Sequence, residues 1–351
     1  MANRFVQLDA LRFFFAVIVV LGHAFGFEAT LVNGGFAVDF FFILSGFVLS
    51  HALIGRPSSA AGFAWARLAR LYPLHLVTLA WIVVIVLRTV PQDLIPAAPE
   101  LAVHLTMLQG LAILGKHTWN QPSWSISIEL IVNILLFYPI VRARSVAAAT
   151  ACVVGAYAAI LVIWGPLFNG FSIQRIGSPL LSGGLLRGVG GILLGYLLYE
   201  AHLALKRRLA AGTGFRRAAT AIESAGLCIL GLSMAIDSPV LHYLPVPISA
   251  LLILQMATVP GAVSRALGTR FFAALGDISF SIYLLHTPLL ITFGAAGLIT
   301  LDTRAGSFFA WALYLVMLVP LSFASFRYIE RPLQRRLMRY SGWWRTSTAT
   351  S

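Results

Sequence analysis

Charged side chains are scarce in this chain of 351 residues. Only 11% of the sequence is Asp, Glu, Lys or Arg, whereas 59% is hydrophobic. Soluble globular proteins carry about 25% charged residues, which keep their surfaces hydrated. The composition therefore excludes an ordinary soluble protein and indicates one whose main solvent is lipid.

Cysteine is almost absent, and the few histidines are dispersed. Cys152 and Cys228 both lie within apolar stretches, so neither a disulfide framework nor a metal cluster is indicated. Six histidines show no metal-ligand spacing: His51, His75, His104, His117, His202 and His242. We therefore expect no bound metal and no permanently bound cofactor.

Acidic residues are also few, since 12 Asp and Glu stand against 25 Lys and Arg and give a net charge of +13. The arginines form short clusters between apolar runs and do not cover one soluble face, which argues against nucleic-acid binding. The positive-inside rule places such clusters on the cytoplasmic side of a membrane. The clusters at 56–70, 142–144, 206–217, 265–270 and 331–345 share that side if both termini are cytoplasmic.

Long apolar runs recur almost to the end of the sequence. A helix needs about 20 apolar residues to cross a hydrocarbon core of about 30 Å. The stretch 101–114 is too short, and we expect a re-entrant or interfacial helix there. The pattern predicts an all-α, polytopic membrane domain over residues 1–335 and a short basic cytoplasmic tail over 336–351. Its ten expected transmembrane helices cover residues 8–27, 36–55, 71–90, 124–141, 146–164, 181–201, 218–236, 244–263, 272–299 and 307–329.

Arg12 and His23 are ionisable residues within the first expected helix. Eleven residues apart, they return to nearly the same face, separated by roughly 16 Å along the axis. Ionisable groups in apolar helices are costly and hence functional candidates. A histidine can take a proton from a hydroxyl and return it, so His23 is the candidate general base. The alternative is a histidine that hydrogen-bonds between helices.

The second expected helix begins near Asp39 and contains Ser45 and Gly46. Asp39 either orients His23 or holds substrate, or it is a solvated charge at the helix end. Ser45 and Gly46 are small residues, which favours a role in close helix packing.

A cationic fork is predicted at Arg67 and Arg70, which are three residues apart and share a helical face. Guanidinium groups bind phosphate in bidentate geometry, so the fork suits a phosphate-rich donor such as coenzyme A. Ordinary anchoring of the helix at the cytoplasmic surface is the alternative.

Polar residues open the fourth expected helix, at Trp124, Ser125 and Glu129. Ser125 and Glu129 are four residues apart, so the carboxylate points into the bundle. Glu129 is therefore a candidate substrate anchor or partner of His23, with a structural carboxylate as the alternative. In the ninth expected helix, Tyr283 and His286 form a neighbouring polar pair, which either orients substrate or hydrogen-bonds between helices.

Together these segments resemble the acyltransferase-3 family of bacterial membrane acyltransferases, from about residue 7 to 332. The matching pieces are Arg12 followed by ten residues and His23, Phe41 to Phe47 with Leu-Ser-Gly-Phe, Arg67 and Arg70 with Pro73, Trp124-Ser125 with Glu129, Ser281 to His286, and Glu330-Arg331-Pro332. Each piece alone is weak, but six in this order are specific.

The resemblance implies a multi-pass protein of the bacterial cytoplasmic membrane. It implies transfer of an acyl group, commonly acetyl, from cytoplasmic acyl-CoA as co-substrate to a hydroxyl of a surface or exported glycan or a related acceptor. Arg12 and His23 match the family's essential first-helix motif. Some members also carry an extracytoplasmic hydrolase-like domain, and this chain is expected either to complete transfer alone or to hand the acyl group to a separate protein.

These expectations combine in one mechanism. Arg12, Arg67 and Arg70 hold the CoA phosphates, and His23 activates the acceptor hydroxyl or carries the acyl group covalently, oriented by Glu129 or Asp39. The main rival is a transporter of an acyl group or glycan intermediate, because intramembrane charges also line translocation paths. A structural membrane protein without turnover is a further alternative. Glycine-rich faces at 183–184 and 188–195 pack either within the chain or between chains of an oligomer.

Overall fold

Helices make up nearly all of the structure, a computed structural model that describes residues 4–25, 35–165, 175–208, 215–300 except 237 and 239, and 305–340. The α-helices are α1 Val6–Phe25, α2 Gly35–Leu53, α3 Ala60–Thr89, α4 Ala98–Leu105, α5 Trp124–Val132, α6 Tyr138–Arg142, α7 Val146–Trp164, α8 Gly183–Arg208, α9 Phe215–Ala235, α10 Pro245–Thr258, α11 Ala262–Leu267, α12 Arg270–Ala295, α13 Phe308–Ser325 and α14 Arg331–Tyr340. Short 3₁₀ helices occupy Gln92–Leu94, Gln121–Ser123 and Leu241–Tyr243, and π-helical turns at Asn133–Phe137 and Phe326–Glu330 join α5 to α6 and α13 to α14.

Strands occur only as two small hairpins in the described part of the chain. The strands are β1 Arg175–Ile176, β2 Ser178–Ser182, β3 Ile299–Thr300 and β4 Ala305–Gly306, and both pairs are antiparallel. The all-α fold predicted from the composition is therefore confirmed.

Nine helices in the described residues are long and apolar enough to cross a membrane. They confirm a multi-pass membrane protein and match nine of the ten expected spans. The tenth, expected at 244–263, is wrong in length, because α10 has only 14 residues. At 1.5 Å per residue it reaches about 21 Å, short of the hydrocarbon core. Pro260 follows Val259, whose φ of −133° and ψ of 84° are not helical, and this pair ends the helix early.

Two other boundaries differ from the prediction. α3 starts at Ala60, eleven residues before the expected start of its span at 71, so Arg67 and Arg70 lie inside a continuous helix that also contains Pro73. In the stretch 101–114, helix extends only to Leu105, where α4 ends. Met107 then adopts a φ of 54°, which breaks the helical path.

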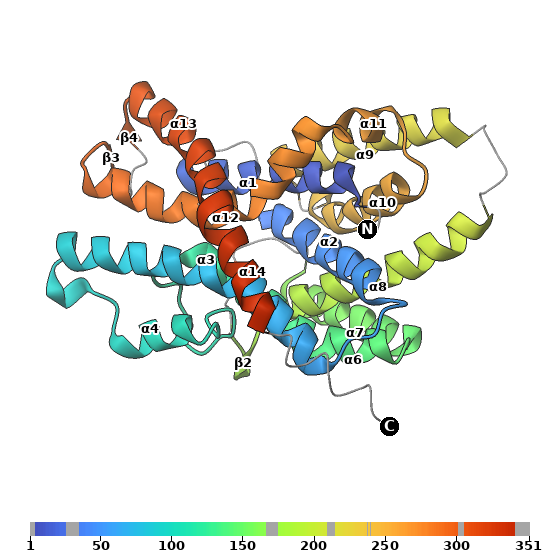
Figure 1. Ribbon diagram of the computed structural model, residues 1–351, viewed down its shortest axis with the longest axis horizontal. Coiled ribbons are helices and arrows are strands. Elements are labelled where there is room, and N and C mark those ends of the chain that lie inside the picture. Colours follow the sequence, from blue (N-terminus) through green and yellow to red (C-terminus); the bar gives the residue numbers. More distant parts are fainter. Residues whose placement is uncertain are drawn as a thin grey trace.

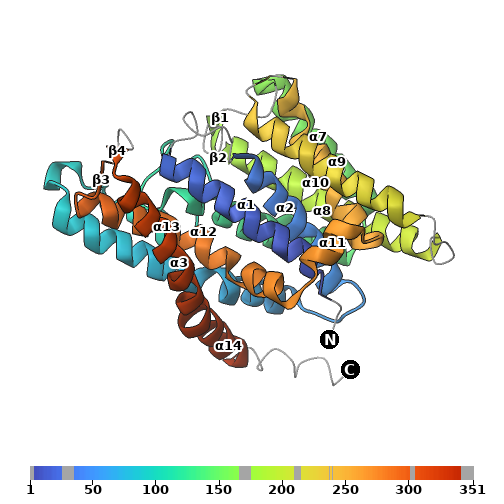
Figure 2. The ribbon, with the colours of Figure 1, turned by 90° about the horizontal axis from the view of Figure 1, so that it is seen from above.

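Two groups of helices flank α1 and α2 in the bundle (Figure 2). One group is α7 to α10 and the other is α3, α12 and α13. α1 packs along α12 and α2 packs along α8, while α1, α3 and α12 lie roughly parallel (Figure 1). α1 and α12 run in the same direction, because Arg12 contacts Ser279 near their starts and His23 contacts His286 further along.

Glycines allow α2 and α8 to approach each other closely. A Cβ atom at Gly46 would lie 1.8 Å from the Ile192 carbonyl oxygen, and one at Gly195 would lie 2.1 Å from the Ile43 carbonyl oxygen. Only glycine fits at such a backbone contact. Gly195 of the 188–195 stretch therefore packs within the chain, and Gly46 has the packing role expected for it.

Candidate active site

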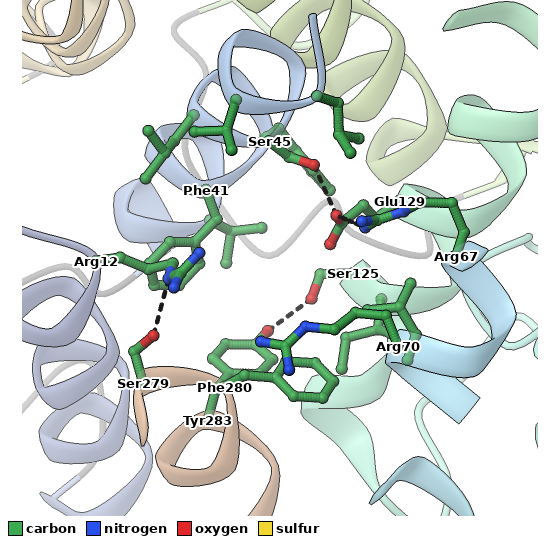
Figure 3. Close-up of a pocket in the computed structure, with 17 residues that line it drawn as sticks. Arg12, Phe41, Ser45, Arg67, Arg70, Ser125, Glu129, Ser279, Phe280 and Tyr283 are labelled. Carbon is green, nitrogen blue, oxygen red and sulfur yellow. Dashed lines mark hydrogen bonds and ion pairs between the residues drawn. The ribbon is translucent and has the colours of Figure 1, made fainter. Parts of the chain in front are cut away.

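A pocket lies between α1, α2, α3, α5 and α12 (Figure 3). Its lining positions on α2 run from Val38 to Leu49, about 16 Å along the helix axis. The pocket brings together six of the residues singled out in the sequence: Arg12, Arg67, Arg70, Ser125, Glu129 and Tyr283. Apolar side chains, among them Phe41, Phe42 and Phe280, form most of the remaining wall.

Arg67 and Glu129 face each other across one side of the pocket and form an ion pair (Figure 3). The same carboxylate oxygen accepts a hydrogen bond of 2.6 Å from the Ser45 hydroxyl. Ser45 was expected only to permit helix packing, and its polar contact was missed because the partner comes from a distant helix. The Arg67 Nε atom is buried without a hydrogen-bond partner.

Arg70 is held by residues from the C-terminal part of the chain. It forms an ion pair with Glu330, whose other oxygen accepts a 2.9 Å hydrogen bond from Ser281. The guanidinium carbon also lies 5.0 Å from the centre of the Phe280 ring. The pieces of sequence around 70, 281 and 330 therefore meet at one place, which sequence spacing alone does not reveal.

Arg12 reaches the pocket from α1 (Figure 3). Its Nε donates to the Ser279 hydroxyl at 2.8 Å, and one terminal nitrogen donates to the Gly276 carbonyl at 3.1 Å. Asp9, one turn earlier, lies 3.0 Å from the same nitrogen. The guanidinium is therefore fixed in place before any ligand binds.

Tyr283 and Ser125 meet at the pocket wall. Their hydroxyl oxygens are 2.7 Å apart, and each also lies within hydrogen-bond distance of the Pro122 carbonyl, Tyr283 at 3.0 Å and Ser125 at 3.2 Å. The edge of the Tyr283 ring packs on Phe41, with centroids 5.8 Å apart.

His23 and His286 form a second group, with ring centroids 5.0 Å apart. Neither is among the described residues that line the pocket. His23 Nδ1 lies 3.0 Å from the Val19 carbonyl oxygen. A carbonyl oxygen only accepts, so Nδ1 carries the proton and Nε2 holds the lone pair of a base. His286 Nδ1 donates in the same way to the Tyr283 carbonyl at 2.7 Å.

Asp39 and Trp124 belong to a third group around Arg187, outside the pocket lining. Both Asp39 oxygens accept from Arg187, at 3.0 and 2.8 Å, and the Arg187 guanidinium lies 5.6 Å from the Trp124 ring centre. Asp39 is 1% exposed, so it is not a solvated charge at the helix end. Arg187 was missed because it sits in a glycine-rich run typical of packing.

The expectation that Asp39 or Glu129 orients His23 is not met in this structure. The hydrogen bonds of Asp39 go to Arg187, and those of Glu129 go to Ser45 and Arg67. His286 lies against His23 instead. Among the residues that the structure describes, no group of three His, Cys, Asp or Glu side chains is placed to hold a metal ion.

Comparison with known proteins identifies the family. A family model described as an acyltransferase domain matches residues 5–327. "Protein 2 in picA locus" of Rhizobium radiobacter is 32% identical over 184 residues, which cover 46% of this chain and 94% of that protein. "Acyltransferase MdmB" of Streptomyces mycarofaciens is 32% identical over 139 residues, 37% of this chain and 35% of that protein. No solved structure matches significantly.

The matched region contains every helix of the pocket and both histidines of the pair. The chain belongs to the acyltransferase-3 family and is a multi-pass membrane acyltransferase.

Proposed function

We propose that the protein transfers an acyl group, acetyl in the first instance, from acyl-CoA to a hydroxyl of a cell-envelope glycan or a related exported acceptor. The observation that carries this proposal is the pocket itself, in which three arginines face an apolar chamber next to a histidine pair. Such a chamber suits an anionic donor with a long, weakly polar arm.

The arginines favour a phosphate-bearing donor. Arg12, Arg67 and Arg70 all line the pocket, where they pair with Asp9, Glu129 and Glu330 respectively. A guanidinium carries five N–H donors, so each pair leaves donors for a phosphate. Guanidinium groups pair with phosphate oxygens in fork geometry, and low local polarity strengthens the contact. The positive-inside rule places this end of the bundle in the cytoplasm, where acyl-CoA is made available.

The histidine pair supplies the proton transfer. His23 Nε2 takes the proton of the acceptor hydroxyl while the hydroxyl oxygen attacks the thioester carbonyl carbon. The C–S bond then breaks, the ester forms, and the proton passes from His23 to the departing CoA sulfur. His286 lies against His23 and keeps its ring in position, with its own Nδ1 proton held by the Tyr283 carbonyl.

The experiment follows both halves of the donor. Purified protein in lipid vesicles receives acetyl-CoA labelled on the acetyl group, together with a glycan extract of cell envelopes. The proposal predicts equal amounts of free CoA and of label bound covalently to the extract. Movement of label across the bilayer with the thioester intact would instead identify a transporter, and covalent label in lipid only would show a different acceptor.

A further inference from the structure

Tyr283 is the residue through which the arginine-lined pocket meets the histidine pair. On α12, Ser279, Phe280 and Tyr283 line the pocket, whereas His286, one turn further, does not. The Tyr283 and His286 rings are 6.1 Å apart, and the His286 Nδ1 proton is bound by the Tyr283 carbonyl. On α1, which runs in the same direction, Arg12 lines the pocket and His23 lies eleven residues beyond it.

Hydrogen bonds with Pro122 and Ser125 hold Tyr283 between the arginine-lined pocket and the histidine pair, and we call this group the latch. The Tyr283 hydroxyl contacts the Ser125 hydroxyl at the start of α5 (Figure 3). It also contacts the Pro122 carbonyl in the turn before that helix. The side chain is 6% exposed, and Phe41 supports the ring from α2. The latch therefore joins α12 to α5 between the two groups that must meet during transfer.

We propose that Tyr283 determines what attacks the thioester. In the latched position its ring is the end wall of the pocket, so a donor in the pocket is shielded from water on the histidine side. When the hydroxyl leaves Pro122 and Ser125, the carbonyl of a short acyl group reaches His23, where the bound acceptor hydroxyl attacks. This inference rests on the proposed acyl-CoA donor and adds that the wall favours transfer over hydrolysis.

Hydrolysis of the thioester by water competes with acyl transfer, and its rate is the quantity that a change at Tyr283 should alter. If water attacks, the C–S bond breaks as in transfer, but the products are free carboxylic acid and CoA. Tyr283→Phe keeps the ring and removes the hydroxyl. It therefore weakens the hydrogen-bonded latch without leaving a gap in the pocket wall. Loss of one hydrogen bond of ordinary strength raises the open population by up to about tenfold. Acceptor-independent CoA release is expected to rise by a similar factor.

A matched control comes from α3. Tyr72 also donates a hydrogen bond from its hydroxyl to a backbone carbonyl, that of Leu105 at 2.6 Å, and it does not line the pocket. Tyr72→Phe removes an equivalent bond and is expected to leave acceptor-independent release at the wild-type rate. Ser125→Ala, which removes the second member of the latch, is expected to act in the same direction as Tyr283→Phe.

A second measurement does not depend on activity. In a chain with Cys152→Ala and Cys228→Ala, Val48→Cys places a thiol at a half-buried position of the pocket lining. A membrane-impermeant thiol reagent is then added to one side of sealed vesicles at a time. With Tyr283 present, the thiol is expected to react from the N-terminal side only. With Tyr283→Phe, it is expected to react from both sides.

The two measurements separate the latch from the donor. Changed labelling together with increased acceptor-independent release supports the proposal. If labelling changes but the wild type cleaves no thioester, the result supports Tyr283 as a barrier in the pocket and refutes acyl-CoA as the donor. Thioester cleavage with equal labelling in both backgrounds, or with no increase in release for Tyr283→Phe, overturns the role of Tyr283 and leaves the proposed function in place.

Discussion

The imidazole rings of His23 on α1 and His286 on α12 lie 5.0 Å apart, and each holds its Nδ1 proton against a backbone carbonyl of its own helix. Both rings are therefore fixed in the tautomer that leaves Nε2 as the basic nitrogen. Two helices from opposite ends of the sequence thus build one histidine pair, to which we assign the proton transfer, beside the arginine-lined pocket.

Loss of the Arg67 guanidinium is predicted to weaken donor binding. Arg67→Ala removes the unpartnered Nε and the partner of Glu129, so the Michaelis constant for acyl-CoA should rise by about 10- to 100-fold, the range for a charged hydrogen bond. Arg88→Ala, an exposed arginine of the same helix, is the control and should leave this constant unchanged. Equal effects of the two substitutions on steady-state kinetics would refute a donor site at Arg67.

The buried Asp39–Arg187 pair is predicted to support stability. Arg187→Met leaves the Asp39 carboxylate, 1% exposed, without its partner, and a loss of about 3–5 kcal/mol in the free energy of unfolding is expected. The double variant with Asp39→Leu removes both charges and should recover most of that loss. Thermal unfolding in detergent measures both, and a double variant less stable than the single one would contradict the assignment.

Acid destabilisation is predicted at His104, in α4 outside the membrane-spanning helices. Burial lowers the pKa of His104 to about 4, below the ordinary value of about 6.5. As the pH falls, His104 is therefore protonated in the unfolded chain before it is protonated in the folded one. Its contribution to the free energy of unfolding is fully present above pH 6.5. The contribution is lost as the pH falls from 6.5 towards 4, by on the order of 3 kcal/mol. His104→Asn removes this titrating group, so its free energy of unfolding should decrease less between pH 7.5 and 5 than that of wild type, by the contribution of about one proton. An unchanged slope of unfolding temperature with pH would argue against a buried neutral ring.

Close packing of α2 and α8 is predicted to tolerate no side chain at Gly46. Gly46→Ala places a methyl group 1.8 Å from the Ile192 carbonyl oxygen, so the helices must separate. A cost of several kcal/mol is expected, as for overpacked cores. Gly155→Ala in α7, where a Cβ meets nothing within 4 Å, is the control and should be neutral or slightly stabilising. Folded yield after purification and unfolding temperature report both.

Much of the fold follows from the sequence, because apolar length and arginine position are local properties. Nine spans, the shared helical face of Arg67 and Arg70, and the inward-facing Glu129 are visible in the pattern. Partner choice is not local. The pairing of Arg70 with Glu330 joins residues 260 positions apart, so helical spacing carries no signal for it.

The partners of the two carboxylates show the same limit. Glu129 and Asp39 both have a plausible place beside His23 on a helical map, yet they pair with Arg67 and Arg187. An unpaired arginine within a bilayer is costly, so each carboxylate is drawn to the nearest guanidinium. The partner of Asp39, Arg187, was not predicted. An arginine inside an apolar, glycine-rich helix is the signal that could have indicated a buried ion pair.

The role of His23 is tested most directly by a single-turnover experiment with His23→Asn. The asparagine amide can still donate to the Val19 carbonyl but has no basic nitrogen, so the fold and the pocket should be retained. We predict wild-type binding of acetyl-CoA and a rate of acceptor-dependent CoA release that is lower by about 100-fold or more, the usual contribution of a general base. Binding with an unchanged release rate would contradict this prediction.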